Sequence, residues 1–112
     1  MECLFCKIVA GEIPADEIYR DDDAIAIADV NPQAPKHVLV LPRKHYATVA
    51  DILDGGDEAL LGHVVAVATK LARDFGSRGF RLVVNTGVEG GQTVDHVHVH
   101  VLAGRHMSWP PG

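Results

Sequence analysis

The chain has 112 residues, a length typical of one domain, so we expect a single unit over residues 1–112. Its formal net charge of −5 excludes a broadly basic surface, and we therefore expect neither nucleic acid nor an anionic membrane as a partner. The sequence has no apolar run long enough to span a bilayer and no signal-peptide pattern at residues 1–7, which favours a cytoplasmic location.

The first third of the chain predicts a short helix followed by three strands. Apolar residues recur at helical spacing near the start and stop at Gly11. An acidic run at residues 21–23 separates two short segments rich in β-branched and small residues, and we interpret it as the solvated turn of a hairpin rather than as a metal site. The elements expected here are a helix at 3–10 and strands at 17–20, 24–29 and 37–42.

The second half predicts one long helix and two further strands. From Asp57 onward, apolar residues recur at spacings of three and four, which indicates an amphipathic helix capped by Asp54 or Asp57. The helix is expected to end near Gly76 or Gly79, and His63 on its polar side is expected to be solvated. The remaining elements are a strand at 80–85, a glycine-rich loop at 87–92 and a last strand at 94–102.

Helices and strands are segregated along this chain, which predicts an α+β architecture. Short connections favour a meander over crossovers. We therefore expect an antiparallel meander sheet of about five strands, with one long helix and a short N-terminal helix.

Three histidines alternate with valines in the last predicted strand. Because successive side chains of a strand point to opposite faces, the valines should enter the core while His96, His98 and His100 share the other face. One metal ion cannot bind all three, since the ends of the run lie roughly 13 Å apart and metal–nitrogen bonds are about 2 Å long. An imidazole can attack phosphorus or transfer a proton at neutral pH, which favours catalysis by the middle residue, His98, with structural roles left open for the outer two.

A glycine-rich loop leads directly into the histidines. Glycines allow main-chain N–H groups to approach an anion, and Asn85, Gln92 and Thr93 add neutral hydrogen-bonding groups. The loop lacks the lysine of a P-loop, so that motif is excluded. Joined to the histidine strand, the loop is interpreted as a cradle for phosphate.

The segment 90–102, Gly-Gly-Gln-Thr-Val-Asp-His-Val-His-Val-His-Val-Leu, resembles the signature of the histidine triad (HIT) family, in which three histidines alternate with hydrophobic residues. Residues 3–15 and 29–45 and the tail 105–112, which ends in Trp-Pro-Pro-Gly, resemble the Hint branch of that family. The resemblance implies a HIT-like fold and a purine nucleoside 5′-phosphoramidase that forms a nucleotidyl-histidine intermediate and releases a nucleoside monophosphate. It also implies a homodimer joined around the long helix and an edge strand, with each tail directed toward the partner's site.

The resemblance further implies roles for individual residues. His98 would attack the α-phosphorus, His100 would contact the phosphate, and Thr93 would replace a serine common in the family and assist the leaving amine. His96 would orient His98 through the main chain, and His37 would be a fourth histidine behind the triad. Nucleotide-binding roles would fall to Asp29 for the ribose hydroxyls, to Asn85, Gln92 and Gly91 for the phosphate, to Phe5, Ile8, Ile27 and Val30 for the purine, and to Trp109 in the tail. Plain core packing is the alternative for each of the four apolar residues.

Cys3 and Cys6 have the spacing of a zinc-binding pair, and His45 and His96 could complete a Cys₂His₂ set. Some bacterial HIT proteins resemble this arrangement and carry a structural zinc there. The alternative is that both cysteines pack as small apolar residues without a metal. The proposed chemistry itself requires no cofactor.

Two other functions compete with the phosphoramidase. One is a hydrolase or phosphorylase of dinucleoside polyphosphates within the same family. The other is a zinc-stabilised nucleotide-binding module with little turnover.

Overall fold

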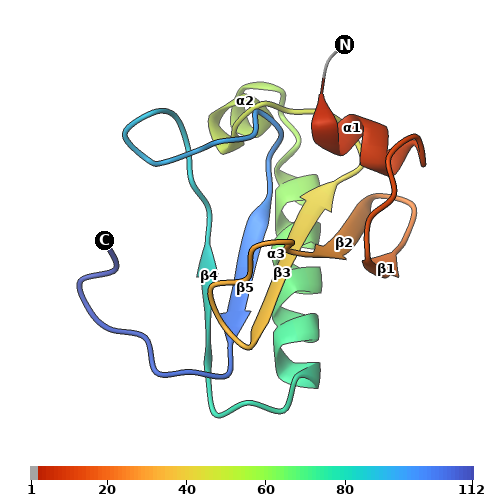
Figure 1. The fold of residues 1–112 in the computed structure, drawn as a ribbon. Helices are drawn as coiled ribbons and strands as arrows, with labels where there is room; N and C mark the ends of the chain where they lie inside the picture. The colour runs from red at the N-terminus through yellow and green to blue at the C-terminus, as the bar shows by residue number, and fades with distance from the viewer. Residues whose placement is uncertain (1–2) are drawn as a thin grey trace.

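The computed structural model describes residues 3–112, which form a five-stranded sheet with a helix on either face (Figure 1). Its elements in chain order are α1 (Leu4–Val9), β1 (Glu17–Arg20), β2 (Ala24–Ala28), β3 (Lys36–Pro42), α2 (Val49–Asp54), α3 (Glu58–Asp74), β4 (Phe80–Val83) and β5 (Val99–Ala103).

The strands lie in the order β1-β2-β3-β5-β4, and every neighbouring pair is antiparallel. The predicted α+β fold with five antiparallel strands, one long helix and a short N-terminal helix is therefore confirmed. The meander, however, runs only from β1 to β3. The segment containing α2 and α3 carries the chain past the position next to β3 to the far edge of the sheet, where β4 forms. β5 then returns and occupies the position between β4 and β3. The strand that contains the end of the histidine motif is thus paired on both sides.

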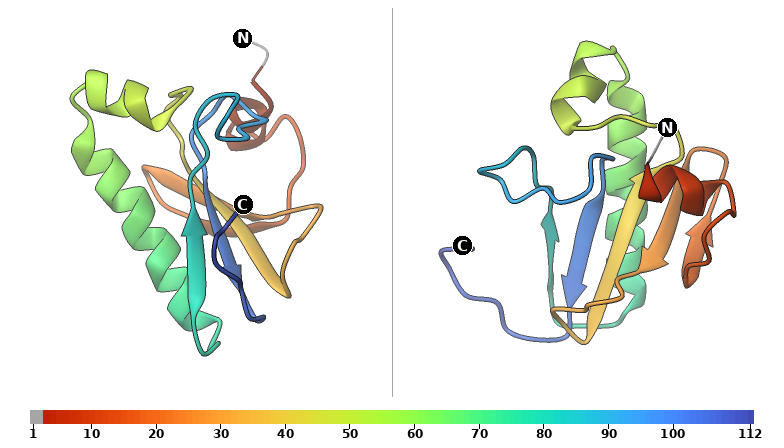
Figure 2. Two further views of the ribbon diagram at one scale, coloured as in Figure 1. Left: turned by 90° about the vertical axis from the view of Figure 1, so that its left-hand side faces the viewer. Right: turned by 45° about the horizontal axis from the view of Figure 1, so that its top comes forward.

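Side chains of the two sheet faces enter two separate cores. On one face Ala26, Val40 and Val99 pack with residues of α3, and on the other Ile25 and Leu39 pack with residues of α1. The left view of Figure 2 shows α3 lying along one side of the sheet and α1 on the other. The histidines alternate with the valines of the α3 core, so they belong to the α1 side.

Two helices follow β3 where the sequence predicted one. α2 is only six residues long, and its start is fixed by a capping box in which Thr48 Oγ1 accepts from the Asp51 N–H and the Asp51 carboxylate accepts from the Thr48 N–H. α3 begins after Asp57, one of the two predicted caps, although its carboxylate accepts from Tyr46 Oη rather than from a helix N–H. It ends just before Gly76, whose φ of +68° suits glycine. No helix among residues 3–112 has the length and apolar character to cross a membrane.

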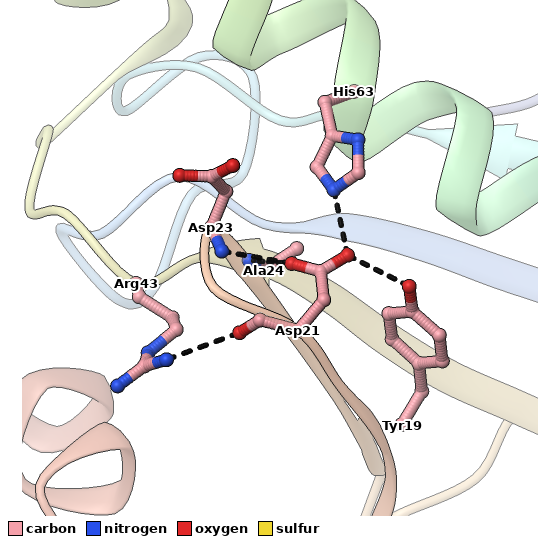
Figure 3. A network of polar contacts seen from close by, with 6 residues as sticks. All are labelled: Tyr19, Asp21, Asp23, Ala24, Arg43 and His63. Carbon is pink, nitrogen blue, oxygen red and sulfur yellow. Dashed lines mark hydrogen bonds and ion pairs between the residues drawn. The ribbon is translucent and has the colours of Figure 1, made fainter.

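A polar network ties α3 to the β1–β2 turn (Figure 3). The Asp21 carboxylate accepts hydrogen bonds from Tyr19 Oη and from His63 Nε2, both at 2.7 Å. It also accepts from the main-chain N–H groups of Asp23 and Ala24, at 2.8 and 2.7 Å. Burial alone would raise the pKa of Asp21, but these four bonds outweigh it and hold the pKa well below its usual range. The prediction that His63 is solvated is wrong: the side chain is half-buried and paired.

Candidate functional site

The histidine motif forms part of a covered site on the α1 side of the sheet. β5 begins only at Val99, so His96 and His98 precede the paired strand, which the sequence predicted to start at residue 94. The alternating valines are buried, as predicted. The opposite side is also covered, because the Phe5 ring of α1 contacts the rings of His96 and His98 edge-on, with centroids 5.9 and 5.1 Å apart. His96 is fully buried and His98 is 6% exposed.

The main chain fixes which nitrogen of His98 carries hydrogen. Nδ1 of His98 lies 2.7 Å from the carbonyl oxygen of His96. A carbonyl can only accept, so Nδ1 donates and Nε2 keeps its lone pair in the neutral ring. The rings of Phe5 and His100 also contact the His98 ring in T-shaped pairs, with centroids 5.1 and 5.0 Å away. With its hydrogen on Nδ1, the His98 ring has the tautomer that attack through Nε2 requires.

A second chain of hydrogen bonds runs through His37 and His100. The main-chain N–H of Gln33 donates to Nδ1 of His37 at 3.0 Å, so the hydrogen of the neutral His37 ring lies on Nε2. That Nε2 is 2.9 Å from Nδ1 of His100 and 3.3 Å from a carboxylate oxygen of Asp29. Nδ1 of His100 therefore accepts, and its Nε2–H remains available as a donor.

Burial keeps both rings of this chain neutral. It lowers the pKa of His37, an effect that the nearby Asp29 carboxylate only partly opposes. Burial, assisted by His98 and His37, lowers the pKa of His100 to about 4. At neutral pH, His100 is thus an uncharged hydrogen-bond donor rather than an imidazolium ion.

The side chains of Cys3, Cys6, His45 and His96 converge on one point. Nδ1 of His96 lies 3.4 Å from Cys3 Sγ, 3.6 Å from Cys6 Sγ and 3.2 Å from Nδ1 of His45. Cys6 Sγ is 3.3 Å from Nδ1 of His45. Around a tetrahedral zinc ion, two nitrogens are about 3.3 Å apart and a nitrogen and a sulfur about 3.5 Å apart. The four ligand atoms therefore have the spacing of a Cys₂His₂ zinc centre.

The tautomer of His96 also suits a metal. Its Nε2 lies 2.8 Å from the carbonyl oxygen of Pro42, to which it must donate, and this leaves the Nδ1 lone pair directed at the thiols. Burial lowers the pKa of His96, which keeps that lone pair free. Burial and the adjacent Cys3 raise the pKa of Cys6 to about 11, so an ion would have to displace the thiol proton when it binds.

Two other groups of side chains are close enough to hold an ion: Asp29 with His37 and His100, and Asp21 and Asp23 with His63. In the first group the hydrogen bond from Gln33 leaves the hydrogen of His37 on Nε2, the atom that would have to bind the ion. In the second, the Asp21 carboxylate already accepts four hydrogen bonds, which favours the predicted interpretation of residues 21–23 as a turn. The cysteine-containing group is thus the best metal candidate among the described residues.

The glycine-rich loop is closed by its own hydrogen bonds. The N–H of Gly91 donates to Val88 at 3.1 Å, and that of Gln92 to Gly87 at 3.0 Å. The Gln92 side chain accepts from the Gly87 N–H at 3.0 Å, and its amide nitrogen donates to the carbonyl oxygens of Ala47 and Val94 at 2.6 and 3.0 Å. Gln92, expected to bind phosphate, therefore braces the loop in this structure. Asn85 is half-buried just after β4, and Thr93 is exposed immediately before the histidines.

The four residues expected to line the purine slot occupy different environments. Phe5 and Ile27 are buried and share one core cluster, with Ile8 packed against it. Val30 is fully exposed, in the loop after β2. Asp29 stands at the start of that loop, where one carboxylate oxygen accepts from the Asn31 N–H at 2.8 Å. The structure brings Asp29 close to the histidines and leaves Val30 outside the packed region.

The tail after β5 passes β4 and ends beyond that edge of the sheet (Figure 1). A cavity of about 720 Å³ lies between the start of β4 and the beginning of the tail, with Arg78, Arg81 and Arg105 among its lining residues. Trp109, expected in the nucleotide site, is 82% exposed in this tail.

Sequence reasoning missed the main-chain groups that orient the imidazoles. The carbonyl of Pro42 and the N–H of Gln33 set the tautomers of His96 and His37. Main-chain groups carry no residue-type signal, although the two prolines of residues 31–35 indicate the ordered loop that presents Gln33.

The chain is similar to known proteins in both sequence and fold. The family model described as the HIT domain matches residues 10–107. An uncharacterized HIT-like protein of Synechocystis sp. is 49% identical over 112 residues, which cover 99% of this chain and 97% of that relative. The crystal structure of a HIT family hydrolase from Legionella pneumophila Philadelphia 1 is similar with a TM-score of 0.94 and 49% identity, covering 99% of this chain and 100% of the other. A histidine triad protein from Clostridium difficile gives a TM-score of 0.90 at 44% identity, covering 96% of this chain and 95% of the other.

Proposed function

The chain belongs to the HIT family, and on that basis we propose that it is a hydrolase of purine nucleoside 5′-phosphoramidates that acts through a nucleotidyl intermediate on His98. The observation that carries this proposal is the 2.7 Å hydrogen bond from His98 Nδ1 to the His96 carbonyl, because it leaves Nε2 of His98 free to attack. The hydrolase named among the solved relatives supports the reaction class.

In the first half of the reaction, Nε2 of His98 attacks the α-phosphorus and the phosphorus–nitrogen bond to the amine breaks. The amine leaves with the bonding electron pair and takes up a proton, for which the exposed hydroxyl of Thr93 is a candidate donor or relay. As positive charge develops on the His98 ring, the His96 carbonyl stabilises its Nδ1–H.

In the second half, water attacks the phosphorus of the nucleotidyl-histidine. Its oxygen forms the new bond, the bond to Nε2 breaks, the water proton is released and a nucleoside monophosphate departs. The uncharged Nε2–H of His100 would donate to a phosphate oxygen in both halves, with its orientation held by the bond from His37. In the same proposal Asp29 accepts from the ribose hydroxyls, Asn85 and Gly91 serve the phosphate, and Phe5, Ile8 and Ile27 border the purine.

The experiment is to mix the chain with adenosine 5′-phosphoramidate, quench rapidly and measure the intact mass. We expect an adduct of one nucleotidyl group on His98 and release of AMP, with neither detected in His98→Ala. His106→Ala is the matched control, since that histidine is exposed and lies outside the site. Faster turnover of a diadenosine polyphosphate would identify the other hydrolase, whereas AMP binding without an adduct would identify a binding module.

We also propose that Cys3, Cys6, His45 and His96 hold a structural zinc ion, as their spacing and the His96 tautomer support. Bound there, the ion would join the first helix to the segment before β5 and would need no contact with substrate. Metal analysis of chain purified without a histidine tag is expected to give one zinc per chain. Clearly substoichiometric zinc after incubation with the metal would contradict the site.

We propose that the chain forms a homodimer through the β4 edge. Among the described residues β4 pairs with β5 alone, and the side chains of Phe80 in the strand and of Val84 just after it are exposed. The tail, with its exposed Trp109, extends past the same edge (Figure 1), where a second copy would meet it. Sedimentation is expected to give twice the chain mass, and a monomer at micromolar concentration would contradict the proposal.

A further inference from the structure

His96 belongs to two sites at once. Its ring nitrogen Nδ1 lies 3.4 Å from Cys3 Sγ and 3.2 Å from Nδ1 of His45, inside the candidate metal centre. Its carbonyl oxygen accepts the hydrogen of His98 Nδ1 at 2.7 Å. The third polar atom, Nε2, donates to Pro42 at 2.8 Å, so the ring cannot turn without breaking a hydrogen bond to a fully buried residue.

A second physical connection runs through α1. Cys3 and Cys6 lie on either side of Phe5, whose ring contacts the His98 ring edge-on at 5.1 Å. A helix of six residues has little stability of its own, so its position depends on what anchors its ends. Two thiols bound to one ion with His45 and His96 would anchor α1 over the nucleophile.

We infer that His96 is a positioning residue through which the metal centre sets the orientation and tautomer of His98. The inference rests on the proposed function and on the proposed zinc site, and it adds that the two are coupled. An ion bound by these four side chains would hold the His96 ring at Nδ1 while Pro42 holds it at Nε2, which leaves the carbonyl that accepts from His98 little freedom to move. Without the ion, α1 and the Phe5 ring beside His98 depend on packing alone. The hydrogen bond from His98 Nδ1 to the His96 carbonyl is then less firmly held, and His98 loses its single orientation and tautomer.

The test compares the full chain loaded with zinc and the same chain stripped by a chelator, at a temperature where circular dichroism shows both to be folded. One readout is the ¹⁵N-edited NMR spectrum of the histidine rings, which reports which nitrogen of His98 carries hydrogen. The other is the rate of nucleotidyl-adduct formation in a single turnover. Loaded chain is expected to show one tautomer, with hydrogen on Nδ1. Stripped chain is expected to show a mixture and to form the adduct about tenfold to a hundredfold more slowly.

Two variants separate this coupling from general loosening of the fold. His45→Ala removes a ligand that does not contact His98, and it should behave like stripped chain even after zinc is added. Gly62→Ala, a change on α3 outside both sites where a Cβ meets nothing within 4 Å, should behave like the wild-type chain. A folded stripped chain or His45→Ala variant with the single tautomer and the full adduct rate would overturn the inference, as would a wild-type chain that binds no zinc. A zinc-dependent tautomer without any adduct would overturn the proposed function and support the coupling.

Discussion

Nε2 of His63 lies 2.7 Å from a carboxylate oxygen of Asp21, and this contact joins α3 to the β1–β2 turn across 42 residues of sequence (Figure 3). The main-chain carbonyl of the same aspartate accepts from Arg43, just after β3, at 3.0 Å. One residue therefore connects the hairpin turn, the long helix and the end of a central strand. The turn leads into β2 and Arg43 follows β3, so this network holds one end of two strands whose side chains pack with α3.

Asp21→Asn is expected to lower the free energy of unfolding at pH 7 by about 1–3 kcal/mol, because an amide cannot replace a carboxylate that accepts four hydrogen bonds. The matched control is Asp22→Asn, at the exposed neighbouring position, which should change the value by less than about 0.5 kcal/mol. Urea titrations followed by circular dichroism give both numbers.

The stabilisation that Asp21 gives the folded chain should also depend on pH in a defined direction. The pKa of Asp21 is held below its usual range in the folded chain, so the unfolded chain takes up this proton first as pH falls. The stabilisation is complete above the ordinary carboxyl pKa of about 3.9 and declines below it. The difference between wild type and Asp21→Asn should therefore shrink in acid, and a difference that grew there would contradict the network.

His100 should make the chain less stable as the pH falls below 6.5, the ordinary pKa of a histidine side chain. Its pKa is lowered from 6.5 to about 4 by burial and by His98 and His37, so between these values the unfolded chain binds a proton that the folded chain does not. The contribution is complete above pH 6.5 and is lost as pH falls toward 4, with a slope of up to about 1.4 kcal/mol per pH unit. His100→Gln should reduce the slope of unfolding free energy over this range. Exposed His106→Gln should retain the wild-type slope, and equal slopes in all three chains would contradict the assignment.

Periodicity predicted the parts of this molecule that local sequence determines. Spacings of three and four residues located α3, and the alternation of valine with histidine placed three imidazoles opposite a valine core. α2 was missed because six residues give too little periodicity to detect, and its start depends on a cap at Thr48. The prediction of a meander was only partly right, because a strand's own residues do not indicate whether that strand lies at the edge or at the centre of the sheet.

The site was predicted less completely, for a related reason. The different roles of the three histidines depend on partners that are distant in sequence. His96 meets the cysteines of α1 and the carbonyl of Pro42, whereas His100 meets His37 of β3. Gln92 illustrates the same limit, because nothing in its residue type indicates the bonds to Ala47 and Val94 that it makes, and its contact with phosphate stays a prediction.

Gly90→Ala should impair the reaction more than it impairs folding. A Cβ atom at this position would lie 2.9 Å from the main-chain nitrogen of Thr86 and would also collide with its carbonyl, so the loop would have to shift. A displacement of about 1 Å beside a reacting phosphate can reduce turnover by up to about a hundredfold. Gly62→Ala is the control, since a Cβ there meets nothing within 4 Å and alanine favours the helix. Unchanged phosphoramidate turnover in Gly90→Ala would exclude the loop from the site.

Asp29→Asn should selectively weaken recognition of the ribose. Asp29 directly follows β2 with one carboxylate oxygen 3.3 Å from Nε2 of His37, so a ribose bound to it would lie directly beside the histidines. If the carboxylate accepts from the two sugar hydroxyls, the wild-type chain should bind AMP more tightly than 2′,3′-dideoxyAMP, by about tenfold to a hundredfold. In Asp29→Asn, AMP binding should fall to the level of the dideoxy compound, whose own affinity should hardly change. Calorimetric titration of both ligands against both chains measures this difference. An Asp29→Asn chain that still discriminates between the two ligands as wild type does would assign the ribose to other residues and leave Asp29 with its contact to His37 alone.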